Sequence, residues 1–147
     1  MRGRKRIRVK FESEKSDIPI IKILFGERKE CYALLDTGSE QSLFDNEFVK
    51  QNKLLFEIDQ RQEMLEMKGL TETNNTPVLS WITLFRVGEG KESRVIPAEG
   101  VVFDLSHISD HLVNAYDEDI KIVAILGNDF LSRYNVIIDY EKREITL

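Results

Sequence analysis

The residues with the clearest capacity for chemistry are an aspartate and the three small residues after it, in the stretch LLDTGSEQ (34–41). Asp, Gly and Ser favour turn conformations, so an ordinary turn is one interpretation of Asp36 and its neighbours. The other interpretation is a catalytic carboxylate at the end of a strand. It draws on Gly38, which lets a backbone or a ligand approach closely because it lacks a Cβ. It also draws on two hydroxyls, that of Thr37 beside the carboxylate and that of Ser39, which can bond an outer oxygen of the acid.

A second pattern lies near the end of the chain. The run IKIVAIL (120–126) predicts a buried strand. It ends in the apolar residues Ile125 and Leu126, and Gly127 follows at once. GNDFLSRY (127–134) then has the composition of a short helix. Neither this pattern nor the Asp-Thr-Gly triplet is specific alone, but the two can be compared with known families by their order and spacing.

Together the two patterns resemble those of the retropepsin-like aspartic proteases, single-domain relatives of pepsin with half its size. In that family a strand leads into Asp-Thr-Gly, and an apolar-apolar-glycine segment far downstream opens a short helix. Asp36 and Gly127 stand in that order and at the corresponding spacing. The resemblance extends from IPIIKILF (18–25) to REITL (143–147), which is nearly the whole chain. It implies an acid-protease fold that is mostly β, with a closed barrel, a flap hairpin and two or three short helices.

The resemblance also implies roles for the residues of both patterns. Asp36 is the catalytic acid, Thr37 links two catalytic turns across a dimer, and Gly38 contacts the substrate backbone. Ser39 matches the serine that pepsin-type members have after Asp-Thr-Gly. The strand that ends at 125–127 packs behind the catalytic turn and fixes the position of the acid.

An aspartic endopeptidase of this kind needs two carboxylates that share one proton and hold a water molecule between them. It needs no metal and no cofactor. The chain supplies one Asp-Thr-Gly, so the simplest source of the second carboxylate is Asp36 of another copy in a C2 homodimer. The substrate is then a peptide or protein. The alternative is a catalytically silent module that keeps the fold for dimerisation or peptide binding.

The flap of the family, a hairpin that closes over the substrate, falls within 61–87. Its expected tip consists of Met67, Lys68, Gly69 and Leu70. This tip lacks the glycine-rich run of the viral enzymes. A second departure follows Gly127, because the viral enzymes have an arginine where this chain has Asn128 and then Asp129. The ion pair of that arginine has no evident counterpart here.

Length and composition indicate one folded domain over 1–147, with 1–16 as a basic N-terminal extension or an edge strand. Apolar residues make up 41% of the chain and charged residues 32%, which is typical of a globular protein. The net charge of -5 disfavours nucleic acid or an anionic membrane as a partner of the whole molecule. The basic residues in the first ten positions leave a nucleic-acid arm as a further alternative.

The chain has no apolar run long enough to span a bilayer and no apolar signal region at its start. We therefore expect a cytoplasmic protein. Its single cysteine, Cys31, excludes an internal disulfide and suits a reducing compartment. Because Cys31 alternates with Ala33 and Leu35 on the strand before Asp36, it is interpreted as a packing residue.

Most of the remaining sequence predicts short strands. The expected strands cover 7–11, 18–25, 31–36, two arms within 61–87, 93–105, 120–126, 135–140 and 143–147, with helices over 45–56 and 127–134. The strand at 31–36 is expected to return antiparallel to 18–25. SHISDHLVNAYDED (106–119) is interpreted as a polar connection with at most one helical turn. His107 and His111 have the spacing of a helical metal site, but Ile108 stands where a metalloprotease has glutamate, so they are interpreted as surface histidines.

Overall fold

The structure is a computed structural model that describes residues 5–26, 29–59, 65–66 and 77–147. Its strands are β1 (Arg8–Lys10), β2 (Ile20–Phe25), β3 (Lys29–Leu35), β4 (Leu43–Asp45), β5 (Phe56–Ile58), β6 (Leu65–Glu66), β7 (Pro77–Val78), β8 (Ser80–Glu89), β9 (Glu92–Phe103), β10 (Ile122–Leu126), β11 (Ile137–Asp139) and β12 (Glu144–Thr146). Its helices are α1 (Asn46–Gln51), the short 3-10 helix η1 (Lys53–Leu55), α2 (Ser106–Tyr116) and α3 (Asn128–Arg133). The predicted fold class, mostly β with a few helices, is confirmed.

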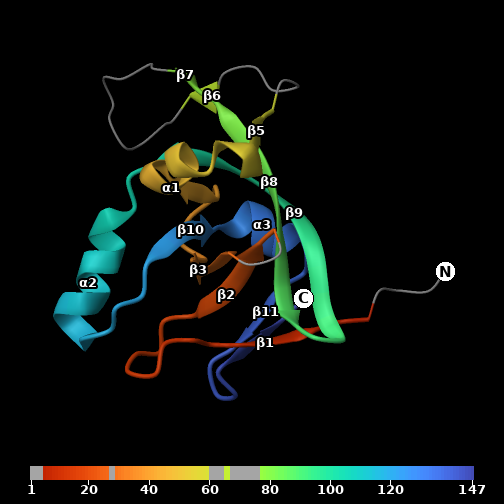
Figure 1. Cartoon of the computed structure of the whole chain (residues 1–147). Helices are drawn as coiled ribbons and strands as arrows, with labels where there is room; N and C mark the ends of the chain where they lie inside the picture. Colours follow the sequence, from red (N-terminus) through yellow and green to blue (C-terminus); the bar gives the residue numbers. More distant parts are fainter. Residues whose placement is uncertain (1–4, 27–28, 60–64, 67–76) are drawn as a thin grey trace.

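A closed barrel forms the centre of the molecule (Figure 1). Its strands follow the order β2-β3-β10-β4-β9-β8, and β8 pairs with β2 to close the ring. β5 pairs antiparallel with the first part of β8, on the edge where β2 pairs with its later part. β3 returns antiparallel to β2, as expected, and β10 lies parallel to β3 on its other side. This parallel pair places the carboxyl ends of two strands that are distant in the sequence next to each other.

The alternation of apolar residues explains why these segments form barrel strands. On β3 the side chains of Cys31, Ala33 and Leu35 are buried, with exposed fractions of 6% or less. All five residues of β10 are buried, because this strand is flanked by β3 and β4 and contributes to both apolar clusters, with Ile122 in one and Val123, Ala124 and Leu126 in the other. Burial also raises the pKa of the Cys31 thiol to about 11, so this cysteine packs in the core as predicted and its thiolate is disfavoured.

The segment 106–119 differs from the prediction. It is not a polar connection with one turn but the helix α2, which spans Ser106–Tyr116. Leu112 is buried against β2 and β10, and Ile108 and Tyr116 pack beside it. These three residues recur every four positions, the spacing of one helical face, and this signal was outweighed by the many polar residues between them. No helix in the described part of the chain is long and apolar enough to cross a membrane.

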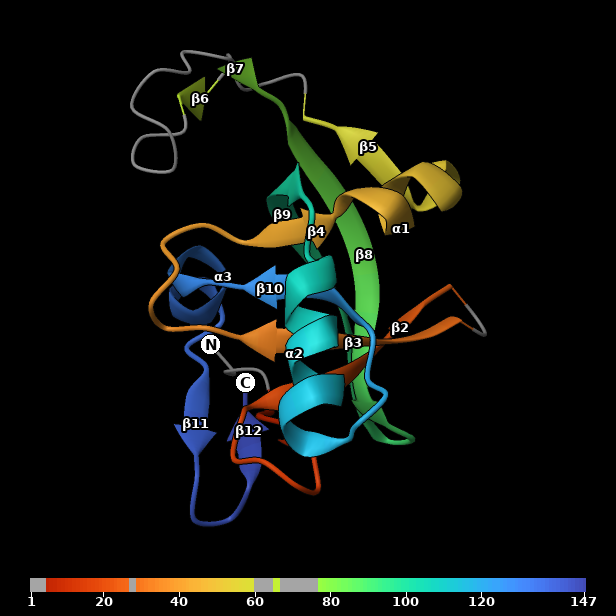
Figure 2. The ribbon, with the colours of Figure 1, turned by 90° about the vertical axis from the view of Figure 1, so that its left-hand side faces the viewer.

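The second arm of the predicted 61–87 hairpin is present as β7 and β8. β6 pairs antiparallel with β7, and Figure 2 shows this pair above the loop that follows β3. The expected flap tip, residues 67–70, lies outside the described residues. β8 continues into a tight turn at 90–91 and returns as β9, which confirms the predicted turn over 88–92.

Both ends of the chain meet in a separate sheet of order β1-β12-β11 (Figure 2). Arg8 and Ile137 flank Thr146 from the two sides, so β12 is the central strand. The REITL strand (143–147) therefore has a partner on each edge. The positions that face inward, Val9 and Ile145, are buried in the main core, which anchors the sheet to the barrel.

Candidate active site

Asp36 lies directly after β3, at the carboxyl end of the parallel β3–β10 pair. Leu35 is in register with Leu126, and the backbone N–H of Asp36 donates to the carbonyl oxygen of Leu126 at 3.0 Å. Both leucines are buried, with exposed fractions of 3% and 0%. The backbone of Asp36 is therefore fixed by a buried strand, whereas its side chain is only half-buried.

The residues after Asp36 form a turn, which we call the Asp36 turn (residues 36–41). The backbone N–H of Gly38 donates to Asp36 Oδ1 at 2.8 Å, and the N–H of Ser39 donates to the Asp36 carbonyl oxygen at 3.2 Å. These bonds orient the carboxylate from within its own turn. A Cβ at position 38 would lie 3.1 Å from Asp36 Oδ1, so a side chain there would crowd the acid.

Ser39 differs in detail from the expectation. Its hydroxyl donates to the carbonyl oxygen of Gln41 at 2.7 Å and not to the carboxylate of Asp36. The hydroxyl thus closes the far side of the turn and does not bond the acid. Thr37 and Gly38 are exposed at the tip of the turn, where they can meet another molecule.

Gly127 packs directly against the Asp36 turn. A Cβ at this position would lie 2.6 Å from the carbonyl oxygen of Ser39 and 2.7 Å from that of Gln41, distances that real Cβ atoms do not adopt. Next to it, the N–H of Asn128 donates to the Ser39 carbonyl oxygen at 2.7 Å. The glycine is needed because two backbones approach each other here. The expected proximity of Asp36 and Gly127 is confirmed.

Ser42 and Asp129 hold the two segments together through side chains. The Ser42 hydroxyl donates to Asp129 Oδ1 at 2.7 Å and accepts from the N–H of Gly127 at 3.0 Å. The N–H of Ser42 donates to Asp129 Oδ2 at 3.1 Å, and the N–H of Phe130 donates to Oδ1 at 2.8 Å. Ser42 has an exposed fraction of 0%. Each polar atom of this hydroxyl is therefore used inside the protein, as buried hydroxyls require.

Asn128 adds a bond from the helix side, because its Nδ2 donates to the carbonyl oxygen of Thr37 at 2.8 Å. Sequence reasoning noted Asn128 and Asp129 only as departures from the viral arginine, and it missed Ser42. In the structure these three residues connect α3 to the Asp36 turn by hydrogen bonds. The sequence signal that could have indicated them was their position. Ser42 follows the stretch 34–41, and Asn128 and Asp129 follow Gly127.

The structure brings together seven of the predicted site residues and leaves four outside its description. The seven are Asp36, Thr37, Gly38, Ser39, Ile125, Leu126 and Gly127. The four flap residues at 67–70 are not described. The catalytic role of Asp36 stays a prediction. In the described parts of the chain no group of three or more His, Cys, Asp or Glu side chains is placed to hold a metal ion, and His111 instead contacts the ring of Tyr116.

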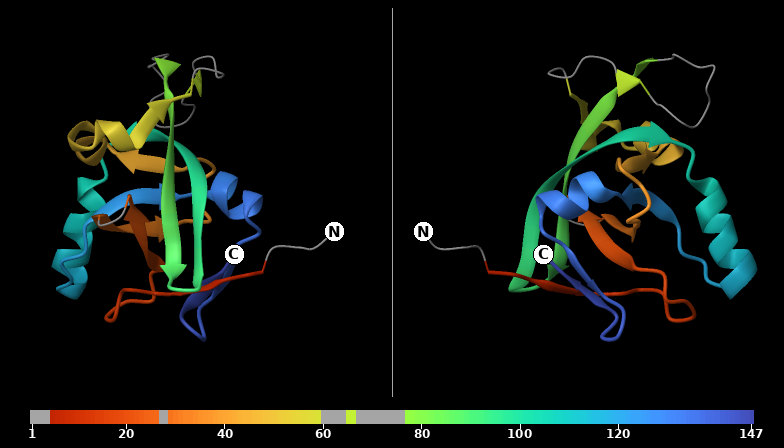
Figure 3. Two further views of the ribbon diagram at one scale, coloured as in Figure 1. Left: turned by 45° about the vertical axis from the view of Figure 1, so that its right-hand side comes forward. Right: turned by 180° about the vertical axis from the view of Figure 1, so that it is seen from behind.

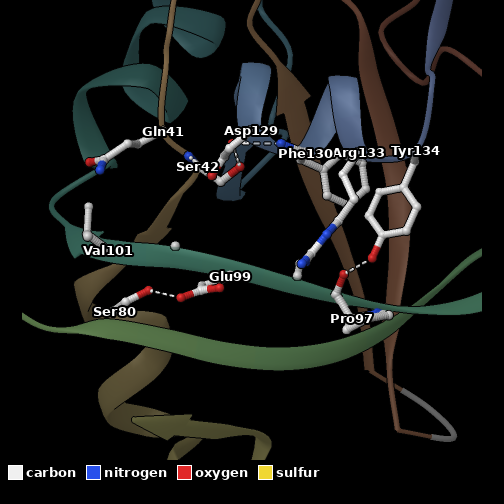
Figure 4. A pocket seen from close by; sticks show the side chains of 12 residues that line it. Gln41, Ser42, Ser80, Pro97, Glu99, Val101, Asp129, Phe130, Arg133 and Tyr134 are labelled. Atoms are coloured by element: carbon white, nitrogen blue, oxygen red, sulfur yellow. Dashed lines mark hydrogen bonds between the residues drawn. The ribbon is translucent and has the colours of Figure 1, made fainter. Parts of the chain in front are cut away.

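A cavity of about 330 Å³ lies beside the Ser42–Asp129 contact (Figure 4). Its walls come from α3 and β9, and Figure 4 shows the Ser80 hydroxyl directed at Glu99, to which it donates at 2.8 Å. Gln41 lines the cavity and also ends the Asp36 turn, whereas Asp36 is not among the lining residues. The cavity therefore adjoins the candidate site without containing its acid.

No protein-family model and no curated protein matches this sequence. Solved structures do match. The retroviral protease-like domain of Ddi1 from Leishmania major has a TM-score of 0.52 and 17% identity, over 84% of each chain. A retropepsin-like aspartic protease from Rickettsia conorii has a TM-score of 0.48 and 16% identity, over 97% of this chain and 89% of its own. EIAV protease complexed with the inhibitor HBY-793 has a TM-score of 0.41 and 21% identity, over 86% of this chain and 95% of its own.

The likeness to the Ddi1 domain covers most of both chains. Together with the closed barrel and the apposed Asp36 and Gly127 segments, it defines the class of this molecule: the chain has the retropepsin-like fold. At this level of identity the likeness establishes the fold and not the activity.

Proposed function

We propose that this protein is an aspartic endopeptidase in which Asp36 from each of two identical chains forms the catalytic pair. The observation that carries the proposal is the position of Asp36. A half-buried carboxylate sits at the end of a buried parallel strand pair, is oriented by the N–H of Gly38, and lies in a turn that Gly127 and Asp129 hold in place. An ordinary surface turn does not need this amount of support from a distant segment.

In the proposed reaction the two Asp36 carboxyl groups share one proton, because two like charges a few ångströms apart do not both ionise easily. The ionised carboxylate takes a proton from water as the water oxygen attacks the carbonyl carbon of the peptide. The protonated carboxyl gives its proton to the carbonyl oxygen. The tetrahedral intermediate then breaks its C–N bond, and the leaving nitrogen receives a proton from the pair.

The other residues of the turn have supporting roles in this proposal. Thr37 and Gly38 are exposed, so Thr37 is available to the second turn and Gly38 to the substrate backbone. The strand end at Ile125 and Leu126 fixes the base of the turn, since Leu126 accepts the hydrogen bond of the Asp36 N–H. The flap is proposed to come from the segment 61–87, with residues 67–70 at its tip.

The proposed partners are a peptide or protein substrate and a second copy of the chain. Nucleic acid and membranes are not proposed partners, since the net charge is -5. The cytoplasm is the proposed location, because the one cysteine is a buried core residue and not half of a disulfide.

The test is cleavage of a generic peptide library between about pH 4 and pH 7, with wild type and Asp36→Asn compared. Asp36→Asn is expected to lower the rate by about 10³-fold or more, because it removes the base and the shared proton. Asp110→Asn is the matched control, since Asp110 is an exposed acid on α2. Binding of library peptides without cleavage would instead support the silent-module alternative.

A further inference from the structure

We propose that a groove between α1 and the start of β3 binds an acidic segment of a partner protein, one that also carries an apolar side chain. The groove has a volume of about 570 Å³. We call it the lysine groove and define it by Lys29, Lys50, Lys53 and Leu54, which line it. The inference goes beyond the proposed function, because it uses neither Asp36 nor the cleavage of a peptide.

The lysine groove is positively charged. Lys29 begins β3, Lys50 lies in the last turn of α1 and Lys53 begins η1, and all three are exposed. Among the residues that the structure describes, no aspartate or glutamate lines the groove, and none of these lysines takes part in an ion pair. The whole chain has 26 acidic and 21 basic residues. A local positive site on a negative protein attracts carboxylates to one place.

Lys29 is held in position by neutral groups. Its Nζ donates to Asn52 Oδ1 at 2.6 Å and lies 5.8 Å from the centre of the Phe48 ring. Asn52 is itself fixed, because its Nδ2 donates to the carbonyl oxygen of Phe48 at 2.8 Å. An ammonium group has three N–H donors, so Lys29 keeps donors for a carboxylate while its charge stays uncompensated. A cation that is already ordered loses less freedom when a ligand binds.

An apolar side chain lies at the same groove. Leu54 has an exposed fraction of 101%, the largest among the large apolar side chains that the structure describes. The lining next to it is partly apolar, since Phe25 is a core residue and Leu55 packs against the core. A single exposed leucine is ordinary on a protein surface. Beside an apolar lining and the three lysines, however, it supplies a contact that an incoming apolar side chain can cover.

The combination favours an acidic peptide over other anionic partners. Nucleic-acid sites generally add arginine or exposed aromatic rings for stacking, whereas the described lining of the groove has no arginine and one aromatic residue, the buried Phe25. An anionic membrane would meet a protein of net charge -5, which opposes its approach. Acidic side chains that alternate with an apolar one match both the charge and the apolar contact of the groove.

The lysine groove is remote from the candidate site. Figure 2 shows α1 at the right of the view and α3 at the left, on opposite sides of the barrel. The left panel of Figure 3 shows the same separation, with α1 in gold at the left and α3 in blue at the right. Because the Asp36 turn packs against the start of α3, a partner in the lysine groove leaves Asp36 accessible.

The first test measures binding of a fluorescein-labelled peptide of alternating glutamate and leucine by fluorescence anisotropy at low salt. The Asp36→Asn chain is used throughout, so that the probe stays intact if the proposed function holds. Reversing two charges, Lys50→Glu with Lys53→Glu, is expected to weaken binding by about 10-fold or more. Lys91→Glu with Lys142→Glu is the matched control, because both lysines are exposed in turns and give the same change in net charge. The control is expected to change the dissociation constant less than about 3-fold.

A second test isolates the apolar contact. Leu54→Gln is expected to weaken binding of this peptide by about 3-fold or more, and to change binding of a peptide of alternating glutamate and serine by less than about 2-fold. Leu84→Gln is the control, because Leu84 is 59% exposed on β8 and does not line the groove. Both leucines are exposed, so neither replacement should disturb the fold.

Absence of binding of the glutamate–leucine peptide would overturn the inference. Equal weakening by the two double variants would also overturn it, because the peptide would then respond only to net charge. Phosphatidylserine vesicles and duplex DNA serve as alternative probes. If either bound through Lys50 and Lys53 while the peptide did not bind, the groove would have another partner and the inference would be wrong. Cleavage is measured separately on the wild-type chain, so failure of the proposed function and failure of the lysine groove are distinguishable.

Discussion

Two hydrogen-bond clusters connect distant parts of this chain, and they differ in the burial of the side chain at their centre, which is 0% exposed for Ser42 and 36% exposed for Arg143. At the candidate site, Ser42 is fully buried and exchanges bonds with Asp129 and Gly127. In the second cluster, Arg143 donates to Asp17 at 2.7 Å and to the carbonyl oxygens of Ser13 and Ser16. The side chain of Asp17 there is 90% exposed.

The same second cluster includes Glu118, which accepts from the Ser13 hydroxyl and from the N–H of Glu14 at 2.9 Å. Its bonds hold the segment before β2 against the chain after α2 and the turn before β12. Water can replace the partners of an exposed charge, whereas nothing replaces the partners of a buried hydroxyl. The comparison teaches that removal of the Ser42 hydroxyl should cost far more stability than the loss of one contact of Arg143 or of Glu118.

The largest effect is expected for Ser42→Ala. It leaves the N–H of Gly127 without an acceptor and removes a donor from Asp129, so the free energy of unfolding should fall by about 2–4 kcal/mol. Urea denaturation measures this change. Ser132→Ala is the control, because the exposed Ser132 hydroxyl donates to the backbone carbonyl of Asn128 in its own helix at 2.6 Å. Its change in the free energy of unfolding should stay within about 0.5 kcal/mol. Similar values for the two variants would contradict the comparison.

Asp129→Asn is expected to have the next largest effect. An amide has one acceptor oxygen, which can keep the two bonds that Oδ1 accepts from the Ser42 hydroxyl and the Phe130 N–H. Its NH2 group then takes the place of Oδ2, where the N–H of Ser42 meets another donor and loses its acceptor. The expected loss of stability is about 1–3 kcal/mol. The proposed peptidase activity should fall together with stability, because the Asp36 turn loses its support. Unchanged activity and stability would show that the turn does not depend on α3.

Arg143→Lys tests the second cluster. Lysine keeps the charge but cannot reproduce the fork of the guanidinium, which reaches Asp17 and two carbonyl oxygens at once. The expected loss in the free energy of unfolding is about 1 kcal/mol, from differential scanning calorimetry. A loss as large as that of Ser42→Ala would show that the Arg143 cluster is the stronger of the two.

The smallest effect is expected for Glu118→Gln, and it depends on pH. The hydrogen bond from Ser13, followed by the one from the Glu14 backbone, holds the pKa of Glu118 below its usual value of 4.5. A lowered folded-state pKa adds stability above the unfolded pKa, and this stability is lost as pH falls through the folded pKa. The difference between wild type and Glu118→Gln should thus be below about 1 kcal/mol at pH 7 and smaller still in acid. A difference that grows on acidification would refute this assignment.

The sequence was sufficient to predict the parts of the site that depend on backbone geometry. Asp-Thr-Gly and the distant Gly127 each indicate that two main-chain segments approach closely. Glycine is required at position 127 because a Cβ there would collide with the backbone of the Asp36 turn. The Ser42–Asp129 contact could not be predicted, because serine and aspartate are common in turns and their pairing depends on register between β4, β10 and α3. α2 was missed for a related reason, since one buried leucine among polar residues gives a weak pattern. The central place of β12 could not be predicted, because the strand expected over 7–11 does not by itself indicate which strand it pairs with.

The parallel pairing of β3 with β10 has a consequence for the stage of synthesis and folding at which the candidate site can form. Asp36 is placed by Leu126, and its turn is completed by Gly127 and Asp129, so the site joins an early and a late part of the chain. During synthesis the segment that ends at Asp36 leaves the ribosome long before β10 does. Contacts of such long range also form late in folding, because a large loop must close first. A nascent or truncated chain without β10 and α3 therefore contains Asp36 but lacks the contacts that position it. The proposed hydrolysis would then begin only after the whole barrel has closed.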